Sequence, residues 1–298
     1  MILTQCRCSV KHDTETGGHD ADRPDIDKAD DLSGRQWVDT GMMNALLKSC
    51  LIVCPLVFLA GFIDSVAGGG GIISLPAYLM AGLPAHLAAG TNKVVNGCGT
   101  LIATTKYFQN GKVRLRAAAA AVIGALAGSA LGAQFASMIP ETVLKGIMLA
   151  VLPCVAVFLV VRRDFGRDDA APARIEPRRE LIVSALIGLG IGCYDGLIGP
   201  GTGTFMIICF TAFLSLDLLT ASGCSKAANL ASNAGAAVVW ILHGSVFWRL
   251  ALPALVCNIL GNYFGAQYAI RGGSRKIRSM MFVVLGLLFA KMLYELVV

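Results

Sequence analysis

Apolar runs long enough to cross a lipid bilayer fill most of the sequence after residue 44. A helix of about 20 residues spans the hydrocarbon core of a membrane, and the runs at 117–137, 143–161, 250–270 and 279–298 reach or approach that length. Only 15% of the residues are charged, against about 25% in an ordinary soluble domain. The sequence therefore predicts an all-α integral membrane protein that crosses the cell inner (plasma) membrane several times.

The first 44 residues differ sharply from the rest of the chain. They carry nine acidic and five basic side chains, and no apolar stretch typical of a cleaved signal peptide precedes the first long run. A segment this polar is predicted to be disordered. Cys6 and Cys8, with His12 and His19, lack the spacing of a structural zinc site. Neither a metal nor another cofactor is therefore expected.

The membrane region contains one unit twice, as the spacing of its polar residues and glycines indicates. Residues near the start of the unit recur 131 residues later, and those further on recur 133 residues later. Agreement of Asp, Lys, Asn and Gln at nearly constant spacing is not expected by chance. The matching pairs are Gly61 and Gly192, Asp64 and Asp195, Lys93 and Lys226, Asn96 and Asn229, Gly128 and Gly261, Gly132 and Gly265, and Gln134 and Gln267.

This duplication divides the chain into four parts. They are a polar acidic N-terminal tail at 1–44, a first membrane repeat at 45–161, a charged cytoplasmic linker at 162–179 and a second membrane repeat at 180–298.

Each membrane repeat holds five apolar segments, of which the second is short. As a helix it spans less than about 20 Å, so it is predicted to be a half-helix or a re-entrant piece that lines a cavity. Each repeat thus supplies about four to five transmembrane or half-spanning helices. The segments are 45–67, 71–82, 86–107, 117–137 and 143–161 in the first repeat, and 180–198, 203–215, 220–242, 250–270 and 279–298 in the second.

The basic residues of the loops indicate how the halves are oriented, because cytoplasmic loops are rich in Lys and Arg. They concentrate at 106–116 in the first repeat and at 270–278 in the second, which are not equivalent positions. These loops and the basic linker all lie in the cytoplasm if the two repeats are inverted and both termini lie outside. Inverted repeats are typical of secondary transporters. The alternative is a parallel repeat of four spans each, in which the short segments do not cross.

The net charge of +6 sits largely in these loops and forms no patch interleaved with aromatic residues. No nucleic-acid partner is therefore expected.

Two glycine-rich runs follow intramembrane aspartates and predict breaks in the helices. A glycine inside a helix costs about 1 kcal/mol relative to alanine, so such runs interrupt the helix and let backbone approach a ligand. A half-helix that begins after the break would direct its N–H groups and positive dipole end toward an anion. The alternative is that the glycines only allow close helix packing. The runs are Gly68, Gly69, Gly70 and Gly71 after Asp64, and Gly199, Pro200, Gly201, Thr202 and Gly203 after Asp195.

A lysine lies within the third apolar segment of each repeat. Lys93 and Asn96 are three residues apart and share one helix face, as do Lys226 and Asn229. A lysine at bilayer depth costs roughly 2.5–3.5 kcal/mol on insertion scales. Each lysine is therefore expected to pair with one of the two aspartates or with a bound anion. The alternative is that each one extends to a nearby membrane interface.

A third repeated motif, Gly-x-x-x-Gly-x-Gln, places two glycines on one helix face. Gly128 and Gly132 form it in the first repeat, and Gly261 and Gly265 in the second. This spacing is typical of close helix contacts. The alternative is that the glutamines of the motif line a pore.

The order of these motifs resembles the sulfite exporter TauE/SafE family of membrane permeases. The resemblance rests on the run from Gly61 to Pro76, on Gly82-Leu83-Pro84 and on Gly90-Thr91-Asn92-Lys93, and it extends over nearly all of 48–298. It implies transport of small sulfur-containing or related organic anions such as sulfite, sulfoacetate or sulfonates. The second repeat departs from the pattern, because Pro200 interrupts its glycine run and Cys-Ser-Lys replaces Thr-Asn-Lys.

Together these features predict a secondary transporter, not an enzyme, with a small anionic substrate and the lipid bilayer as partners. The aspartates would hold the lysines or carry a coupling proton. The rival hypotheses are a membrane-embedded enzyme and a non-transporting assembly or receptor module. The candidate substrate-binding residues are Asp64, Gly68, Gly69, Gly70, Gly71, Thr91, Asn92, Lys93, Asn96, Asp195, Gly199, Gly201, Gly203, Ser225, Lys226 and Asn229.

Overall fold

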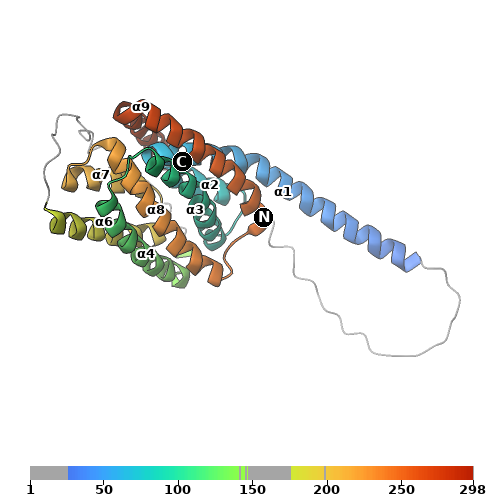
Figure 1. Ribbon diagram of the computed structural model, residues 1–298. Coiled ribbons are helices and arrows are strands. Elements are labelled where there is room, and N and C mark those ends of the chain that lie inside the picture. The colour runs from blue at the N-terminus through green and yellow to red at the C-terminus, as the bar shows by residue number, and fades with distance from the viewer. Residues whose placement is uncertain (1–25, 141, 145, 147–175, 198, 298) are drawn as a thin grey trace. The chain divides into compact units, whose positions relative to one another are not determined.

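The computed structural model describes residues 26–140, 142–144, 146, 176–197 and 199–297. Every regular element among these residues is a helix. The helices, shown in Figure 1, are α1 (Ile26–Ala67), α2 (Gly71–Met80), α3 (Ala85–Gln109), α4 (Leu115–Met138), α6 (Pro177–Leu197), α7 (Thr202–Leu214), α8 (Leu218–Leu242) and α9 (Trp248–Val297).

The helices follow the predicted apolar segments closely. Three of them contain stretches long and apolar enough to cross a membrane, at Leu46–Ala67, Leu115–Met138 and Pro177–Leu197. Helices α3 and α8 are as long, at 25 residues each, but their buried polar residues lower their mean hydropathy. The predicted short segments are the 10-residue α2 and the 13-residue α7.

The structure describes the fifth segment of the second repeat but very little of the fifth segment of the first. The segment predicted at 143–161 lies almost entirely outside the described residues. Its counterpart at 279–298 is the last part of α9, which bends at Gly273, where φ is 63° and ψ is −165°. The linker at 162–179 is described only from residue 176 onward.

Helix α1 begins earlier than the sequence predicts. Composition predicts disorder over 1–44, whereas helix α1 includes the residues from Ile26 onward. The physical reason is that helix nucleation is costly whereas each further residue adds a hydrogen bond. The polar part of α1 is continuous with its apolar part.

The described residues from Cys50 onward belong to one compact unit, and those before Cys50 belong to another. Within the larger unit, the helices contact one another across the two halves of the sequence, since α3 packs against α8 and α9 while α8 also packs against α4. Helix α4 of the first half also packs against α6 of the second. The two halves are therefore packed into each other and do not form separate domains.

Glycines allow these helices to approach closely, as the Gly-x-x-x-Gly motif predicted. A Cβ atom on Gly128 would collide with the carbonyl oxygen of Leu189, and one on Gly261 would collide with that of Phe58. These two contacts are equivalent, because Gly128 and Gly261 are repeat partners and so are Phe58 and Leu189. The same helix pairing therefore occurs twice, each time between a helix of one half and a helix of the other.

Candidate functional site

The two glycine-rich runs break the chain between α1 and α2 and between α6 and α7. Positive φ angles occur at Gly68 (81°), Gly199 (92°) and Gly201 (81°), a conformation that glycine adopts without the steric cost of a Cβ atom. The breaks also touch each other, because a Cβ atom on Gly68 would lie 2.5 Å from the Cα atom of Gly203. The Thr204 amide donates to the Gly68 carbonyl oxygen at 3.3 Å. A side chain at either contact point would separate the breaks.

Two buried ion pairs lie beside the breaks. Lys93 Nζ is 2.7 Å from Asp195 Oδ2, and Lys226 Nζ is 2.8 Å from Asp64 Oδ2. Each aspartate therefore pairs with the lysine of the other half of the sequence. None of the four residues is more than 8% exposed, and Lys226 is completely buried, so extension of the lysines to a membrane interface does not occur.

The two aspartates have different hydrogen-bond partners. Asp195 accepts bonds from the hydroxyl groups of Thr202, at 2.7 Å, and Ser232, in addition to Lys93. Asp64 accepts one further bond, from the Gly70 amide at 3.3 Å. The carboxylate of Asp195 thus has three side-chain donors and that of Asp64 has one.

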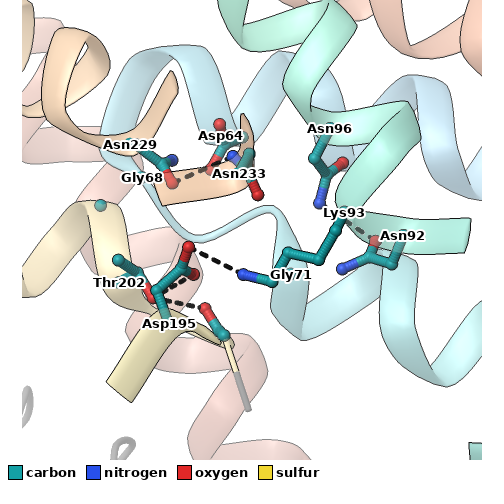
Figure 2. A pocket seen from close by; sticks show the side chains of 12 residues that line it. Asp64, Gly68, Gly71, Asn92, Lys93, Asn96, Asp195, Thr202, Asn229 and Asn233 are labelled. Atoms are coloured by element: carbon teal, nitrogen blue, oxygen red, sulfur yellow. Dashed lines mark hydrogen bonds and ion pairs between the residues drawn. The ribbon is translucent and has the colours of Figure 1, made fainter. Parts of the chain in front are cut away.

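A polar cavity lies where the breaks and the ion pairs meet. Its volume is about 20 Å³, which is room for roughly one water molecule. Figure 2 shows Lys93 reaching from α3 toward Asp195, with the asparagines of α3 and α8 around it. The lining residues are Asp64, Gly68, Gly71, Asn92, Lys93, Asn96, Asp195, Gly199, Thr202, Gly203, Asn229 and Asn233.

Asparagine amides on α3 and α8 form two short chains at the cavity. Asn96 Nδ2 donates to Asn92 Oδ1 at 3.0 Å, and Asn233 Nδ2 donates to Asn229 Oδ1 at 3.1 Å. Asn258 on α9 donates to Asn96 Oδ1 at 3.1 Å. The Nδ2 groups of Asn92 and Asn229 have no partner among the described residues, so they remain able to donate to a ligand.

Backbone N–H groups at the cavity are also unpaired. Helices α2 and α7 begin at Gly71 and Thr202, and neither the Gly71 amide nor the Gly203 amide has a hydrogen-bond partner among the described residues. Both glycines line the cavity. The positive end of a helix dipole lies at its first turn, so both helix starts favour a negative charge there.

Most of the predicted binding residues line this cavity, and six do not. Four of the six have other partners. The Gly70 amide and Lys226 Nζ both donate to Asp64. Thr91 Oγ1 accepts the Phe247 amide at 2.9 Å, and Ser225 Oγ donates to the Gly203 carbonyl oxygen at 2.9 Å. Ser225 thereby fastens α7 to α8. The six residues are Gly69, Gly70, Thr91, Gly201, Ser225 and Lys226.

Three polar residues at the site were missing from the predicted set. Thr202 lies in the glycine-rich run, and Asn233 follows Asn229 by one helical turn, so both had a signal in the sequence. Nothing in the sequence singled out Ser232, because serine is common on packed faces of membrane helices. No group of ligands suited to a metal ion occurs among the residues that the structure describes.

Comparison with known proteins gives a consistent result over most of the chain. The family model described as sulfite exporter TauE/SafE matches residues 53–292. The probable membrane transporter protein ORF9 of Sinorhizobium sp is 36% identical over 227 residues, which are 76% of this chain and 85% of the relative. The probable membrane transporter protein YfcA of Escherichia coli K12 is 32% identical over 256 residues, 85% of this chain and 92% of the relative. No solved structure shows a significant match.

Proposed function

Because this chain belongs to the sulfite exporter TauE/SafE family of membrane transporters, we propose that it is a secondary transporter for small sulfur-containing or organic anions. The observation that carries this proposal is the polar cavity between the two helix breaks. Lys93, Asp64 and Asp195 line it, and the buried Lys226 is paired with Asp64. The N–H groups of Gly71, Gly203, Asn92 and Asn229, which have no partner in the described part of the chain, supply hydrogen bonds to the oxygens of sulfite or a sulfonate.

The net charge of the four ionisable side chains at the site limits how an anion can bind there. Asp64, Lys93, Asp195 and Lys226 sum to zero, and both lysines are already paired. A buried anion without a compensating charge is strongly unfavourable. The anion therefore enters together with a positive charge or displaces an aspartate from its lysine.

The size of the cavity supports a cycle of opening and closing. A space for about one water does not hold a sulfite ion, which has four heavy atoms. The described conformation is then a closed one, and the anion binds after the helices around the breaks separate. Alternating access around a fixed central site has this character.

A direct test is the uptake of radiolabelled sulfite, sulfoacetate and methanesulfonate into proteoliposomes, with and without an imposed proton gradient. At least one of these anions is expected to enter faster than into protein-free liposomes, and radiolabelled choline, a cation, is not. Absence of flux for all three anions would contradict the proposed substrate class. Unchanged anion flux in a protein carrying both Lys93→Ala and Lys226→Ala would remove the lysines from the mechanism.

We also propose that the two repeats are inverted relative to each other and that both termini lie outside the cytoplasm. The basic loops at 106–116 and 270–278 support this orientation. The reciprocal ion pairs relate the halves by a two-fold operation that fits parallel repeats as well as inverted ones. The proposal of inversion therefore rests on the loops.

This topology predicts the behaviour of reporters fused to the C-terminus. Alkaline phosphatase, which is active only outside the cytoplasm, is expected to be active when fused after Val298, and green fluorescent protein in the same place is expected to be dark. The opposite result for both reporters would rule out the inverted arrangement of five segments in each half. A fusion within the basic loop at 106–116 provides the cytoplasmic control.

A further inference from the structure

The two ion pairs are equivalent in the repeated sequence but not in their surroundings. The side chain of Asp64 is 12% exposed and that of Asp195 is 4% exposed. Asp64 borders the cavity with one strong donor, Lys226, and one long bond from the Gly70 amide. Asp195 is bound by Lys93, Thr202 and Ser232.

The difference originates in two substitutions between the repeats. Thr202 and Ser232 provide the extra hydroxyl donors to Asp195. By the spacing of the repeat, Gly71 and Gly99 occupy their equivalent positions in the first half, and glycine has no side chain to donate. The first half therefore lacks both hydroxyl groups.

Hydrogen bonds to a carboxylate favour its charged form. When one oxygen of Asp195 takes a proton, that oxygen becomes a donor, so the hydrogen bonds that it accepts are weakened or lost. The hydroxyl of Thr202 has an alternative acceptor in the Gly199 carbonyl oxygen, also at 2.7 Å, but Lys93 and Ser232 have no second acceptor among the described residues. Protonation of Asp64 disturbs only the Lys226 pair and the long Gly70 bond.

We propose that Asp64 is the residue that takes up the coupling proton, that Lys226 then receives the anion, and that Asp195 and Lys93 remain paired throughout. This inference rests on the proposed transport of an anion. A proton from water binds a carboxylate oxygen of Asp64, which ends the ion pair. The negative charge of the anion then pairs with the Lys226 ammonium group, so that one proton accompanies each monovalent anion and the site stays neutral.

The other ionisable groups near Asp64 fit this assignment. Lys226 on α8 forms an ion pair with it. The buried phenol of Tyr107 on α3 lies close by, and its hydroxyl group donates a hydrogen bond to the Ser65 carbonyl oxygen at 3.0 Å. Lys93 and Asp195 face it across the cavity as a neutral pair. Among the described residues, α2 and α7 line the cavity with Gly71, Thr202 and Gly203, none of which titrates.

Two transport assays separate the roles of the aspartates. Counterflow exchanges labelled for unlabelled anion at equal pH and needs no net proton movement, whereas gradient-driven uptake does. Both are measured in proteoliposomes for Asp64→Asn and Asp195→Asn, with whichever of sulfite, sulfoacetate and methanesulfonate the unmodified protein carries. The ratio of gradient-driven uptake to counterflow is expected to fall about tenfold in Asp64→Asn, the size of a typical coupling between two bound species. In Asp195→Asn both rates fall together, and the ratio stays the same.

The outcomes distinguish this inference from the proposed function. Equal ratios in the two variants, or a fall confined to Asp195→Asn, would overturn the assignment while leaving anion transport intact. No flux in the unmodified protein overturns both. If an asparagine variant does not reach the membrane, Asp64→Glu and Asp195→Glu replace the pair. The pH of half-maximal gradient-driven uptake is then expected to shift in Asp64→Glu only, and a shift in Asp195→Glu alone contradicts the proposal.

Discussion

Replacing Lys226 with methionine is expected to destabilise the protein by about 3–5 kcal/mol, the usual cost of breaking a buried ion pair by removing one partner. Lys226 is completely buried, and its loss leaves the Asp64 carboxylate with only the long hydrogen bond from Gly70. Methionine has a similar length and keeps the packing volume. The measurement is the unfolding transition of purified protein in mixed micelles titrated with sodium dodecyl sulfate.

A second variant distinguishes charge from packing in this experiment. Adding Asp64→Asn to Lys226→Met removes the unpaired charge, so most of the lost stability is expected to return. Arg116→Met is the matched control, since Arg116 is exposed and its loss should change stability little. If the double variant is no more stable than Lys226→Met alone, the loss arises from packing around the lysine stem.

Substitution by alanine is expected to affect stability differently at two glycines of α6. A Cβ atom on Gly188 would collide with the Ala121 carbonyl oxygen and lie 2.9 Å from its Cα atom, whereas one on Gly190 would meet nothing within 4 Å. Gly188→Ala should therefore separate α6 from α4 and cost about 1–3 kcal/mol, as overpacking does. Gly190→Ala should be neutral or stabilising by up to about 1 kcal/mol, through better helix propensity.

The same micelle titration measures both glycine variants. Because the two residues lie on one helix, two positions apart, the comparison cancels effects of purification and detergent. Equal stabilities for Gly188→Ala and Gly190→Ala would show that α4 and α6 do not pack closely in the membrane protein. A loss in Gly190→Ala alone would place the contact on the other face of α6.

The helix boundaries were largely predictable, because apolar length and glycine breaks are local properties of the chain. The segments predicted at 117–137 and 220–242 correspond to α4 and α8 within a few residues. The start of α1 was not predictable in this way, since its polar part lacks the apolar residues that mark the other helices. Composition alone favoured disorder there.

The candidate site was predicted as a set of residues but not as an arrangement. The repeat singled out Asp64, Lys93, Asp195 and Lys226, and all four lie at the two ion pairs beside the cavity. Thr91 was included for its place in the Gly-Thr-Asn-Lys sequence, which does not tell which face of α3 it occupies, and it does not line the cavity. Its hydroxyl accepts the Phe247 amide instead.

The sequence by itself determined that the chain is a duplicated helical membrane protein with an aspartate, a glycine break and a lysine in each half. Such features depend on composition and spacing along the chain. Only the tertiary structure decided that each lysine pairs with the aspartate of the other half, and that Asp195 gains the hydroxyl donors Thr202 and Ser232. The reason is that ion pairing depends on how α1, α3, α6 and α8 pack against one another, and residues more than 100 positions apart leave no local signal of that contact.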